Sequence, residues 1–396
     1  MIVDFDRNLD RRNTDCVKWD GLRATFGTDD VLPLWVADMD FASPPEVVAA
    51  LHARVEHSTF GYALASCRAR EAIVGWLERK HRWKVDPDWI VFASGVVPSL
   101  AVSVLAYTRP GDEVVVQSPV YPPFFEVVKA NGRRLVNSML LNVGGRYEID
   151  WTDLEAKLRG AGTDEGPRMM ILCSPANPVG RVWSRSELER IAELCRLHHV
   201  VLVSDEIHAD IIYPGHRHTP AGDVTLMAPS KTFNLQGLGT SYAVIPDARL
   251  RQAFRTVQSG LGMGQINALG IAAMEAAYTM CDDWHDQLIA YLCANRDYLA
   301  DRIATSAPGI SMVLPEGMYV CWLDCRALGL GPGQLTDFFT YRARVGVNDG
   351  RKFGPGGEGF VRLNIACTRS TLVDALNRIE EALTATGLAE RQRNEV

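Results

Sequence analysis

The sequence lacks a long apolar run. Nowhere in its 396 residues do about 18 apolar side chains follow one another, as a membrane-spanning helix requires. The first residues, MIVDFDRNLDRR, alternate acidic and basic side chains and contain no apolar stretch of the kind found in secretory signals. We therefore expect no membrane partner and a cytoplasmic location.

An excess of positive charge is also missing. Lysine and arginine together number 41 against 48 aspartate and glutamate residues, which gives a formal net charge of -7. A chain with this balance has no general attraction for the phosphates of nucleic acids or for anionic membrane surfaces. We expect that the chain binds no nucleic acid.

Paired cysteines and metal-binding motifs are lacking as well. The nine cysteines are scattered, odd in number and without a C-x-x-C pair, which favours reduced thiols over a disulfide framework. His198 and His199, and the pair His216 and His218, stand without a second cluster of ligands at a suitable spacing. The sequence therefore predicts no metal site.

From about residue 47 to 283 the chain alternates short apolar runs with longer segments of helical period. This pattern is typical of an α/β fold in which a mainly parallel sheet is covered by helices. The segment SRSELERIAELCRLHH, with Ser184 or Ser186 as its cap, is expected to form a crossover helix. The predicted strands are Glu113–Gln117, Arg134–Met139, Met169–Ser174, Val200–Asp205, Val224–Ser230 and Ser241–Ile245.

The pattern changes after a long helical stretch around residues 267–306. Strand-like runs at 311–323 and 359–367 and a final helix at 370–386 predict a smaller α+β domain. The first residues are rich in turns and charge, and we expect them to pack on this smaller domain or on a partner subunit. The predicted division is a large domain at 47–283 and a small domain formed by 1–46 and 284–396.

Three polar residues follow predicted strands: Asn177 in ILCSPANP, Asp205 in VVLVSDEIH and Lys231 in TLMAPSK. In open parallel sheets, ligands gather at the carboxyl ends of the strands. A carboxylate at the end of so apolar a run is costly to bury without a cation, and a protonated pyridine nitrogen is one such cation. A partly buried lysine has the lowered pKa that imine formation requires. Individually, such residues are more often helix caps or solvated side chains.

The sequence around these residues resembles the pyridoxal-phosphate (PLP) dependent aminotransferases of class I/II, which have fold type I. The sequence motifs that carry this resemblance are SPANPVGRVW, SDEIHADIIY and PSKTFNLQGLGTSYAVI. Further motifs, notably LPLWVADMDF, FGYAL, PVYPPF and FVRLNIACTR, are similar to motifs of the cystathionine β-lyase branch known as the MalY/PatB C–S lyases. The resemblance covers nearly the whole chain.

The resemblance implies a role for each matching residue in binding PLP. Lys231 matches the lysine that carries the cofactor as a Schiff base, and Asp205 matches the carboxylate on the pyridine nitrogen. Asn177 matches the residue that contacts the ring oxygen, and Tyr121 the aromatic ring that stacks on the cofactor. The phosphate is expected at the helix that SGVVPSL opens, on the backbone N–H groups of Gly95, Val96 and Val97.

Substrate binding and assembly follow from the same resemblance. Arg362 matches the arginine that binds the α-carboxylate of the substrate, a role that suits the planar guanidinium group. Ala37, in WVADMDF, is also expected to contact the substrate. Tyr62 matches a tyrosine that reaches into the active site of the neighbouring subunit, which implies a homodimer with catalytic sites shared between its subunits.

The chain departs from the wider aminotransferase pattern near the cofactor. His208 stands where many relatives have a tyrosine, so imidazole is expected near the ring oxygen. Ala228 and Gly239 replace a serine and an arginine that bind phosphate in many relatives. Phosphate binding is therefore expected to rely on Ser230, the helix start and Tyr62.

The glycine-rich residues 354–359 do not predict a nucleotide-binding site. Residues 354–359 match G-x-G-x-x-G, but the match follows a loop and precedes a strand-like run, the reverse of the dinucleotide fingerprint. More simply, these glycines shape the loop that carries the chain to Arg362.

The resemblance to the C–S lyase branch favours a β-elimination that cleaves cystathionine or another S-substituted cysteine. Its products would be pyruvate, ammonia and a thiol. Transamination remains an alternative, because it begins with the same removal of the Cα proton by Lys231. A regulatory binding protein that retains the fold is a third hypothesis. No motif encodes the preferred leaving group.

Overall fold

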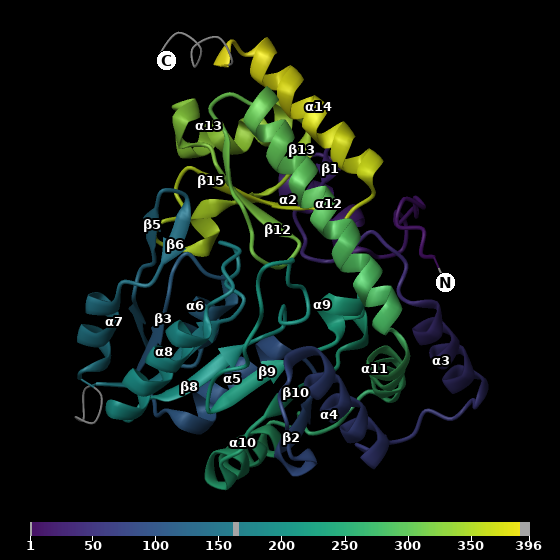
Figure 1. The fold of residues 1–396 in the computed structure, drawn as a ribbon, viewed down its shortest axis with the longest axis vertical. Helices are drawn as coiled ribbons and strands as arrows, with labels where there is room; N and C mark the ends of the chain where they lie inside the picture. The colour runs from purple at the N-terminus through teal and green to yellow at the C-terminus, as the bar shows by residue number, and fades with distance from the viewer. Residues whose placement is uncertain (1, 161–165, 389–396) are drawn as a thin grey trace.

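The computed structural model describes residues 2–160 and 166–388, so residues 1, 161–165 and 389–396 of the predicted domains lie outside the described residues. A seven-stranded sheet in the order β2-β10-β9-β8-β7-β3-β4 forms the lower part of the molecule in Figure 1. Strands β9, β8, β7, β3 and β4 pair in parallel, and β10 is antiparallel to both of its neighbours. The predicted α/β class with a mainly parallel sheet is confirmed. The strands are β2 Ile90–Ala93, β3 Glu113–Val116, β4 Arg134–Asn137, β7 Pro167–Cys173, β8 Val201–Asp205, β9 Val224–Met227 and β10 Ser241–Val244.

All six predicted strands are present in this sheet, and β2 is a seventh that the sequence analysis did not predict. The prediction differs most from the structure at the end of one strand, β9. It extended the strand to Ser230, whereas β9 ends at Met227 and Ser230 begins the short helix α9, Ser230–Phe233. Pro229 explains the difference, because proline donates no ladder hydrogen bond and its fixed φ suits the start of a helix.

Helices cover both faces of the large sheet, because alternate side chains of each strand point to opposite faces. In β7, Met169 and Ile171 belong to the core under one layer of helices, and Met170 and Leu172 belong to the core under the other. The predicted crossover helix is α8, and Ser184 caps it in a capping box with Glu187. The first layer contains α5 Val96–Tyr107, α6 Pro123–Ala130 and α10 Ala248–Gly260, and the second contains α7 Trp151–Leu158 and α8 Arg185–Leu197.

A smaller antiparallel sheet, in the order β11-β12-β15-β14, lies above the large one in Figure 1. Helices α12 and α14 pack beside it, and α12 begins after Cys281, where the predicted helical stretch divides into two helices. The proposed boundary between the two domains remains a prediction. The elements are α11 Ala268–Met280, α12 Asp282–Ser306, β11 Ser311–Val313, β12 Val320–Asp324, α13 Pro332–Asp337, β14 Asn348–Asp349, β15 Phe360–Asn364 and α14 Arg369–Ala385.

The N-terminal residues lie against elements from the other end of the chain. Strand β1, Leu32–Pro33, pairs in parallel with β13, Val345–Gly346. Phe5 packs its ring edge on Trp284 of α12, with 5.6 Å between the ring centroids. The short helices α1, Val17–Asp20, and α2, Leu22–Phe26, precede β1. Segments more than 300 residues apart in sequence are therefore neighbours in the fold.

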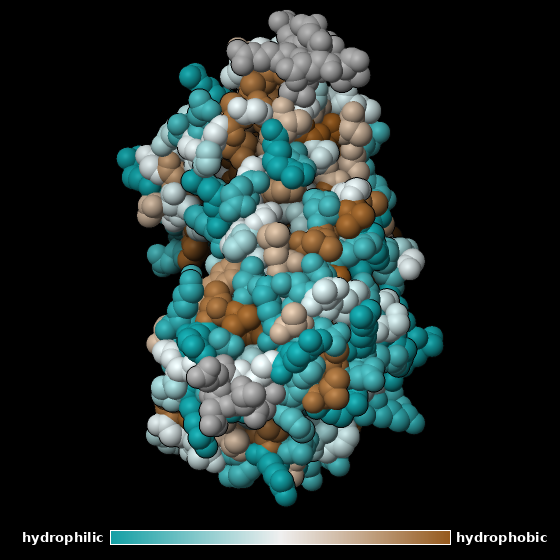
Figure 2. Space-filling model, turned by 90° about the vertical axis from the view of Figure 1, so that its left-hand side faces the viewer, coloured by the Kyte–Doolittle hydropathy of each residue, from teal (hydrophilic) through white to brown (hydrophobic). Residues whose placement is uncertain are grey.

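The described surface exposes large apolar side chains at scattered positions and in one segment between two helices. On the face drawn in Figure 2, hydrophilic side chains predominate and the apolar ones form separate patches. An exposed apolar segment, residues 58–66, connects α3, Pro45–Glu56, to α4, Cys67–His81. Among the described residues, no helix has both the length and the apolar character needed to cross a membrane. A small hairpin of β5, Leu141–Val143, and β6, Arg146–Glu148, completes the strands.

Candidate active site

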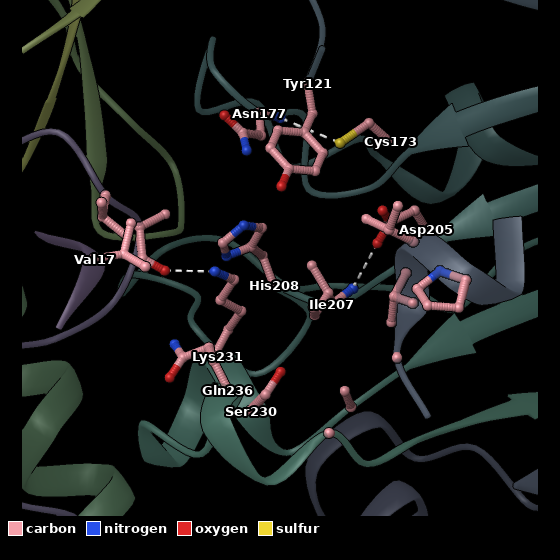
Figure 3. Close-up of a pocket in the computed structure, with 18 of the residues that line it drawn as sticks. Val17, Tyr121, Cys173, Asn177, Asp205, Ile207, His208, Ser230, Lys231 and Gln236 are labelled. Atoms are coloured by element: carbon pink, nitrogen blue, oxygen red, sulfur yellow. Dashed lines mark hydrogen bonds between the residues drawn. The ribbon is translucent and has the colours of Figure 1, made fainter. Parts of the chain in front are cut away.

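A cavity of about 450 Å³ lies at the carboxyl ends of β7, β8 and β9. It receives side chains from the loops after these strands, from the start of α5, from residues 35–37 and from the smaller sheet. Figure 3 shows Lys231, His208 and Asn177 facing this space together. Of the twelve residues that the sequence predicted for binding or catalysis, eleven line the cavity: Ala37, Gly95, Val96, Val97, Tyr121, Asn177, Asp205, His208, Ser230, Lys231 and Arg362.

Lys231 lies on α9, directly after β9, and its side chain points into the cavity. The Nζ atom donates a hydrogen bond to the carbonyl oxygen of Ala37. Burial lowers the pKa of Lys231 to about 8, and the charge of Arg362 acts in the same direction. About a tenth of this amine is therefore neutral near pH 7, the form that a nucleophile or a proton acceptor requires.

Asp205, the last residue of β8, is 4% exposed. One carboxylate oxygen accepts a 3.1 Å hydrogen bond from the amide of Ile207, and no lysine or arginine of the described chain forms an ion pair with it. Burial raises the pKa of Asp205 to about 7, an effect increased by Glu206 and opposed by the amide of Ile207. The charge of Lys231 lowers the pKa in part, but no lysine or arginine of the described residues lies at ion-pair distance from the carboxylate.

Arg362, on β15, is held by three oxygen atoms. Its Nη1 donates to Oδ1 of Asn177 at 3.1 Å, and its Nη2 donates to the carbonyl of Trp35 at 3.0 Å and to Oδ1 of Asn348 at 2.7 Å. The guanidinium group also packs over the ring of Phe353. Burial lowers the pKa of Arg362 to about 10, and its Nε has no hydrogen-bond partner. This buried cation is oriented and can still bind an anion.

Two aromatic side chains lie beside these charged groups. Burial raises the pKa of Tyr121, which keeps its hydroxyl neutral. His208 is buried, and burial together with the charges of Lys231 and Arg362 holds its pKa well below the ordinary value. The imidazole is therefore neutral, and its Nδ1 has no partner in the protein.

The start of α5 provides a site for an anion. Gly95 is the N-cap, no side chain caps the helix, and Gly95, Val96 and Val97 all line the cavity. The first N–H groups of a helix have no partner within the helix and carry a partial positive charge. Ser230 lies in the same cavity, so a phosphate group would meet both backbone and hydroxyl donors.

The structure does not bring Tyr62 to the cavity of its own chain. Its side chain is 93% exposed in the loop between α3 and α4. The predicted role of Tyr62 requires a second subunit.

Several residues that line the cavity were missed by the sequence analysis: Trp35, Gln236, Thr240 and Asn348. Tyr319 donates to the carbonyl of Ala37 at 3.0 Å and thus shares the acceptor of Lys231. Gln236 and Thr240 belong to the same motif as Lys231, and their polar side chains within that motif were an available signal. Asn348 is part of no recognisable motif and depends on the fold alone.

The residues present fit pyridoxal phosphate. A carboxylate without a cation matches a ring nitrogen that becomes protonated, and the helix start matches a phosphate. Lys231 can bond an aldehyde, and the imidazole of His208 lines the same cavity. The ring nitrogen, the phosphate and the aldehyde of the cofactor would thus each meet a protein group whose charge or hydrogen-bonding capacity is not fully used within the protein.

Comparison with known proteins agrees with this fit. Residues 29–379 match the family model of aminotransferases class I and II. The chain is 43% identical to the cystathionine β-lyase PatB of Bacillus subtilis over 96% of its own length and 100% of that protein. It is 32% identical to protein MalY of Escherichia coli, over 97% and 100%. The crystal structure of cystalysin from Treponema denticola, which contains pyridoxal 5'-phosphate, superposes with a TM-score of 0.93 at 34% identity, covering 98% of this chain and 100% of that chain.

Proposed function

The chain belongs to the aminotransferase class I and II family, in its cystathionine β-lyase branch, and we propose that it cleaves the C–S bond of cystathionine or a related S-substituted cysteine. The reaction consumes one water and yields pyruvate, ammonia and a thiol. The observation that carries the proposal is the meeting of Lys231, Asp205 and Arg362 around one cavity. The fold is that of the fold type I PLP enzymes.

When bound, PLP supplies an aldehyde that amines bond reversibly and a ring that withdraws electrons from the substrate Cα. We propose that Asp205 stabilises a positive charge on the ring nitrogen, since only the amide of Ile207 bonds this buried carboxylate and its pKa is raised to about 7. Asn177 uses its Oδ1 to accept from Arg362, which leaves its amide N–H groups free to donate toward the ring oxygen.

Arg362 is proposed to bind the α-carboxylate of the substrate. Its contacts with Asn177, Asn348 and Trp35 fix the plane of the guanidinium group before a substrate arrives. Ala37 lines the same cavity and accepts a hydrogen bond from Lys231, and we propose that it contacts the same substrate.

Lys231 is proposed to move the proton. Its Nζ, neutral for part of the time, accepts the proton from the substrate Cα, and the bond from Cβ to sulfur then breaks with the electron pair leaving on sulfur. The thiolate takes up a proton, and hydrolysis of the remaining three-carbon unit gives pyruvate and ammonia.

The experiment measures pyruvate from L-cystathionine with lactate dehydrogenase and NADH, with PLP present and no 2-oxo acid added. We expect pyruvate from the wild-type protein and none above background from Lys231→Ala. Lys84→Ala, at an exposed lysine, is the matched control and should retain activity. No pyruvate above the Lys231→Ala background would refute cystathionine cleavage. A strict requirement for a 2-oxo acid would instead identify an aminotransferase.

We also propose that the protein acts as a homodimer with shared active sites. The segment between α3 and α4 exposes three large apolar side chains, Phe60 at 62%, Tyr62 at 93% and Leu64 at 82%. Such a segment is costly to leave in water, and a second subunit is the partner that would cover it. In this arrangement Tyr62 contacts the cavity of the neighbouring chain, near the phosphate site.

A cytoplasmic location is proposed from the state of the thiols. All nine cysteines are free, and six of them are buried in the structure. Free thiols persist in compartments that keep them reduced.

A further inference from the structure

The loop after β8 serves two sites, because its residues alternate between the cavity and the interior behind it. Asp205 and His208 line the cavity, whereas Asp210 points into a buried group of side chains. We call this group the rear cluster: Trp76 and His81 of α4, Asp210 of the loop and Thr232 of α9. All four are less than 9% exposed.

Asp210 is the centre of the rear cluster. Its Oδ1 accepts from Trp76 Nε1 at 2.9 Å and lies 2.8 Å from His81 Nε2, and its Oδ2 accepts from the hydroxyl of Thr232 at 2.7 Å. Its backbone carbonyl accepts from His285 Nε2 of α12 at 2.7 Å. Burial would raise the pKa of Asp210, but the hydrogen bond and charge of His81, with help from His285 and Thr232, lower it to about 2. The acceptor is therefore a carboxylate at any physiological pH.

Thr232 is the residue next to Lys231, and the two side chains leave α9 in different directions. The helix has only four residues, and no side chain caps its start. A helix this short has little intrinsic stability, so its orientation depends on its contacts. On one side of the helix, the hydroxyl of Thr232 donates a hydrogen bond to Asp210. On the other side, Asn234, whose backbone is in the left-handed conformation, donates to the carbonyls of Met39 and Phe41.

Resting on the proposed function, we propose that Asp210 is a positioning residue that, through Thr232, fixes the orientation of α9 and thereby the position of the Lys231 amine. Proton transfer depends steeply on this position, because a misplacement of about 1 Å can cost about 100-fold in rate. The rear cluster joins the loop after β8, which follows Asp205 and carries His208, to the helix that carries Lys231.

Thr232→Val tests the proposal, because valine has the shape of threonine without its hydroxyl, and Thr232→Ser retains the hydroxyl. With PLP bound, we expect Thr232→Val to lower kcat by about tenfold to 100-fold with little change in KM. The pH midpoint of the visible absorption band of the lysine-bound cofactor should also move, and borohydride should trap the cofactor on Lys231 more slowly. Thr232→Ser should restore all three measurements toward wild type. Asp210→Asn should change them in the same direction as Thr232→Val.

Thr108→Val is the matched control, since Thr108 is also buried and donates to the carbonyl of Val104. It follows the twelve-residue helix α5, about 18 Å from the end that lines the cavity. It should lower thermal stability and leave kcat and the absorption band unchanged. If Thr232→Val yields no folded protein, Thr232→Ala provides the same comparison.

Thermal destabilisation of Thr232→Val with the kcat and band midpoint of wild type would overturn the proposal, since it would show a structural role only. Failure of the proposed function is a separate result. It would appear as absence of pyruvate from a wild-type protein whose absorption band is normal, and the band and trapping measurements would still decide the role of Asp210.

Discussion

Asp205 makes the stability of the cofactor-free protein depend on pH. Burial and the neighbouring Glu206 raise its pKa to about 7, whereas an aspartate in an unfolded chain titrates near pH ~3.9. Between these two values the native protein binds a proton that the unfolded chain has released. The free energy of unfolding therefore falls as the pH rises through this window.

We expect Asp205→Asn to stabilise the cofactor-free protein at pH 8 by up to about 4 kcal/mol. Asparagine keeps an oxygen acceptor for the amide of Ile207 and carries no charge. At pH 5 the gain should shrink to less than half, because the native carboxyl group is then protonated. Urea unfolding at both pH values measures the difference. Asp301→Asn, at an exposed aspartate, is the control, and an equal gain for Asp205→Asn at both pH values would contradict the assignment.

Arg362 allows a prediction about substrate binding. Lysine keeps the positive charge but lacks the planar arrangement of donors that Asn177, Asn348 and Trp35 orient. We expect Arg362→Lys to raise KM for cystathionine about 100-fold with a smaller change in kcat, since hydrogen bonds to a charged group are lost. The visible band of the bound cofactor should remain. Arg23→Lys, at an exposed arginine, should leave KM unchanged, and an unchanged KM in Arg362→Lys would exclude this role.

At the scale of elements, residues 34–41 form a segment that closes one side of the cavity. The side chain of Asn364 holds it through the carbonyls of Val36 and Asp38, and Asn234 holds it through Met39. Lys18 of α1 is 0% exposed and lies 2.6 Å from Asp40, which also bonds Arg11. The segment that presents Ala37 to Lys231 is therefore tied to both ends of the chain.

We expect Lys18→Met to lower the free energy of unfolding by about 3 to 5 kcal/mol, because it leaves Asp38 and Asp40 with a single cation between them. Urea unfolding followed by tryptophan fluorescence is the measurement. Lys84→Met, on the surface, should change stability by less than about 0.5 kcal/mol. If the free energy of unfolding falls as little in Lys18→Met as in the control, the buried ion pairs contribute little to stability.

The elements that the sequence predicted well are those with a strong local pattern. Strands β7 and β8 are mainly apolar runs, and a predicted site residue ends β8 at Asp205 or follows β7 at Asn177, so both the strands and these residues were evident. Strand β2 was missed because its four residues are secured by antiparallel pairing with β10, a contact with residues about 150 positions later. Ser230 was placed on a strand because the apolar run continues through Ala228, although Pro229 ends the ladder.

The residues of the cavity also divide into those that a local sequence pattern predicts and those that only contacts between distant segments bring to the site. Lys231, Asp205 and Asn177 were predicted from motif words and positions after strands. Asn348 reaches the site only because β14 pairs with β15, where it lies opposite Arg362. The rear cluster was also beyond prediction, because Asp210 meets Trp76, His81 and Thr232 through packing of separate elements.

At the scale of the whole molecule, shared active sites make a prediction about mixed dimers. Tyr62→Ala and Lys231→Ala subunits should each be weakly active or inactive alone. In a mixed dimer, one of the two sites combines an intact Lys231 with the intact Tyr62 of the other subunit. After equal mixing and random exchange, about a quarter of wild-type activity should return, as two-fold symmetry requires.

Analytical ultracentrifugation of the wild-type protein and exchange of labelled subunits establish that mixed dimers form. Tyr341→Ala, at another exposed tyrosine, should remain active without mixing. No recovery after confirmed exchange would show that Tyr62 does not act across the subunit boundary.

The pairing of β1 with β13 bears on how the protein is made. During synthesis residues 32 and 33 leave the ribosome more than 300 residues before their partners at 345 and 346. The cavity requires residues 35–37 from the start of the chain and Asn348 and Arg362 from near its end. A nascent chain can therefore build the large sheet while translation continues, but it acquires a complete binding site only after Asn348 and Arg362 have been added. A truncated product of the ribosome would hold Lys231 without the substrate arginine, so premature termination yields no partly competent enzyme.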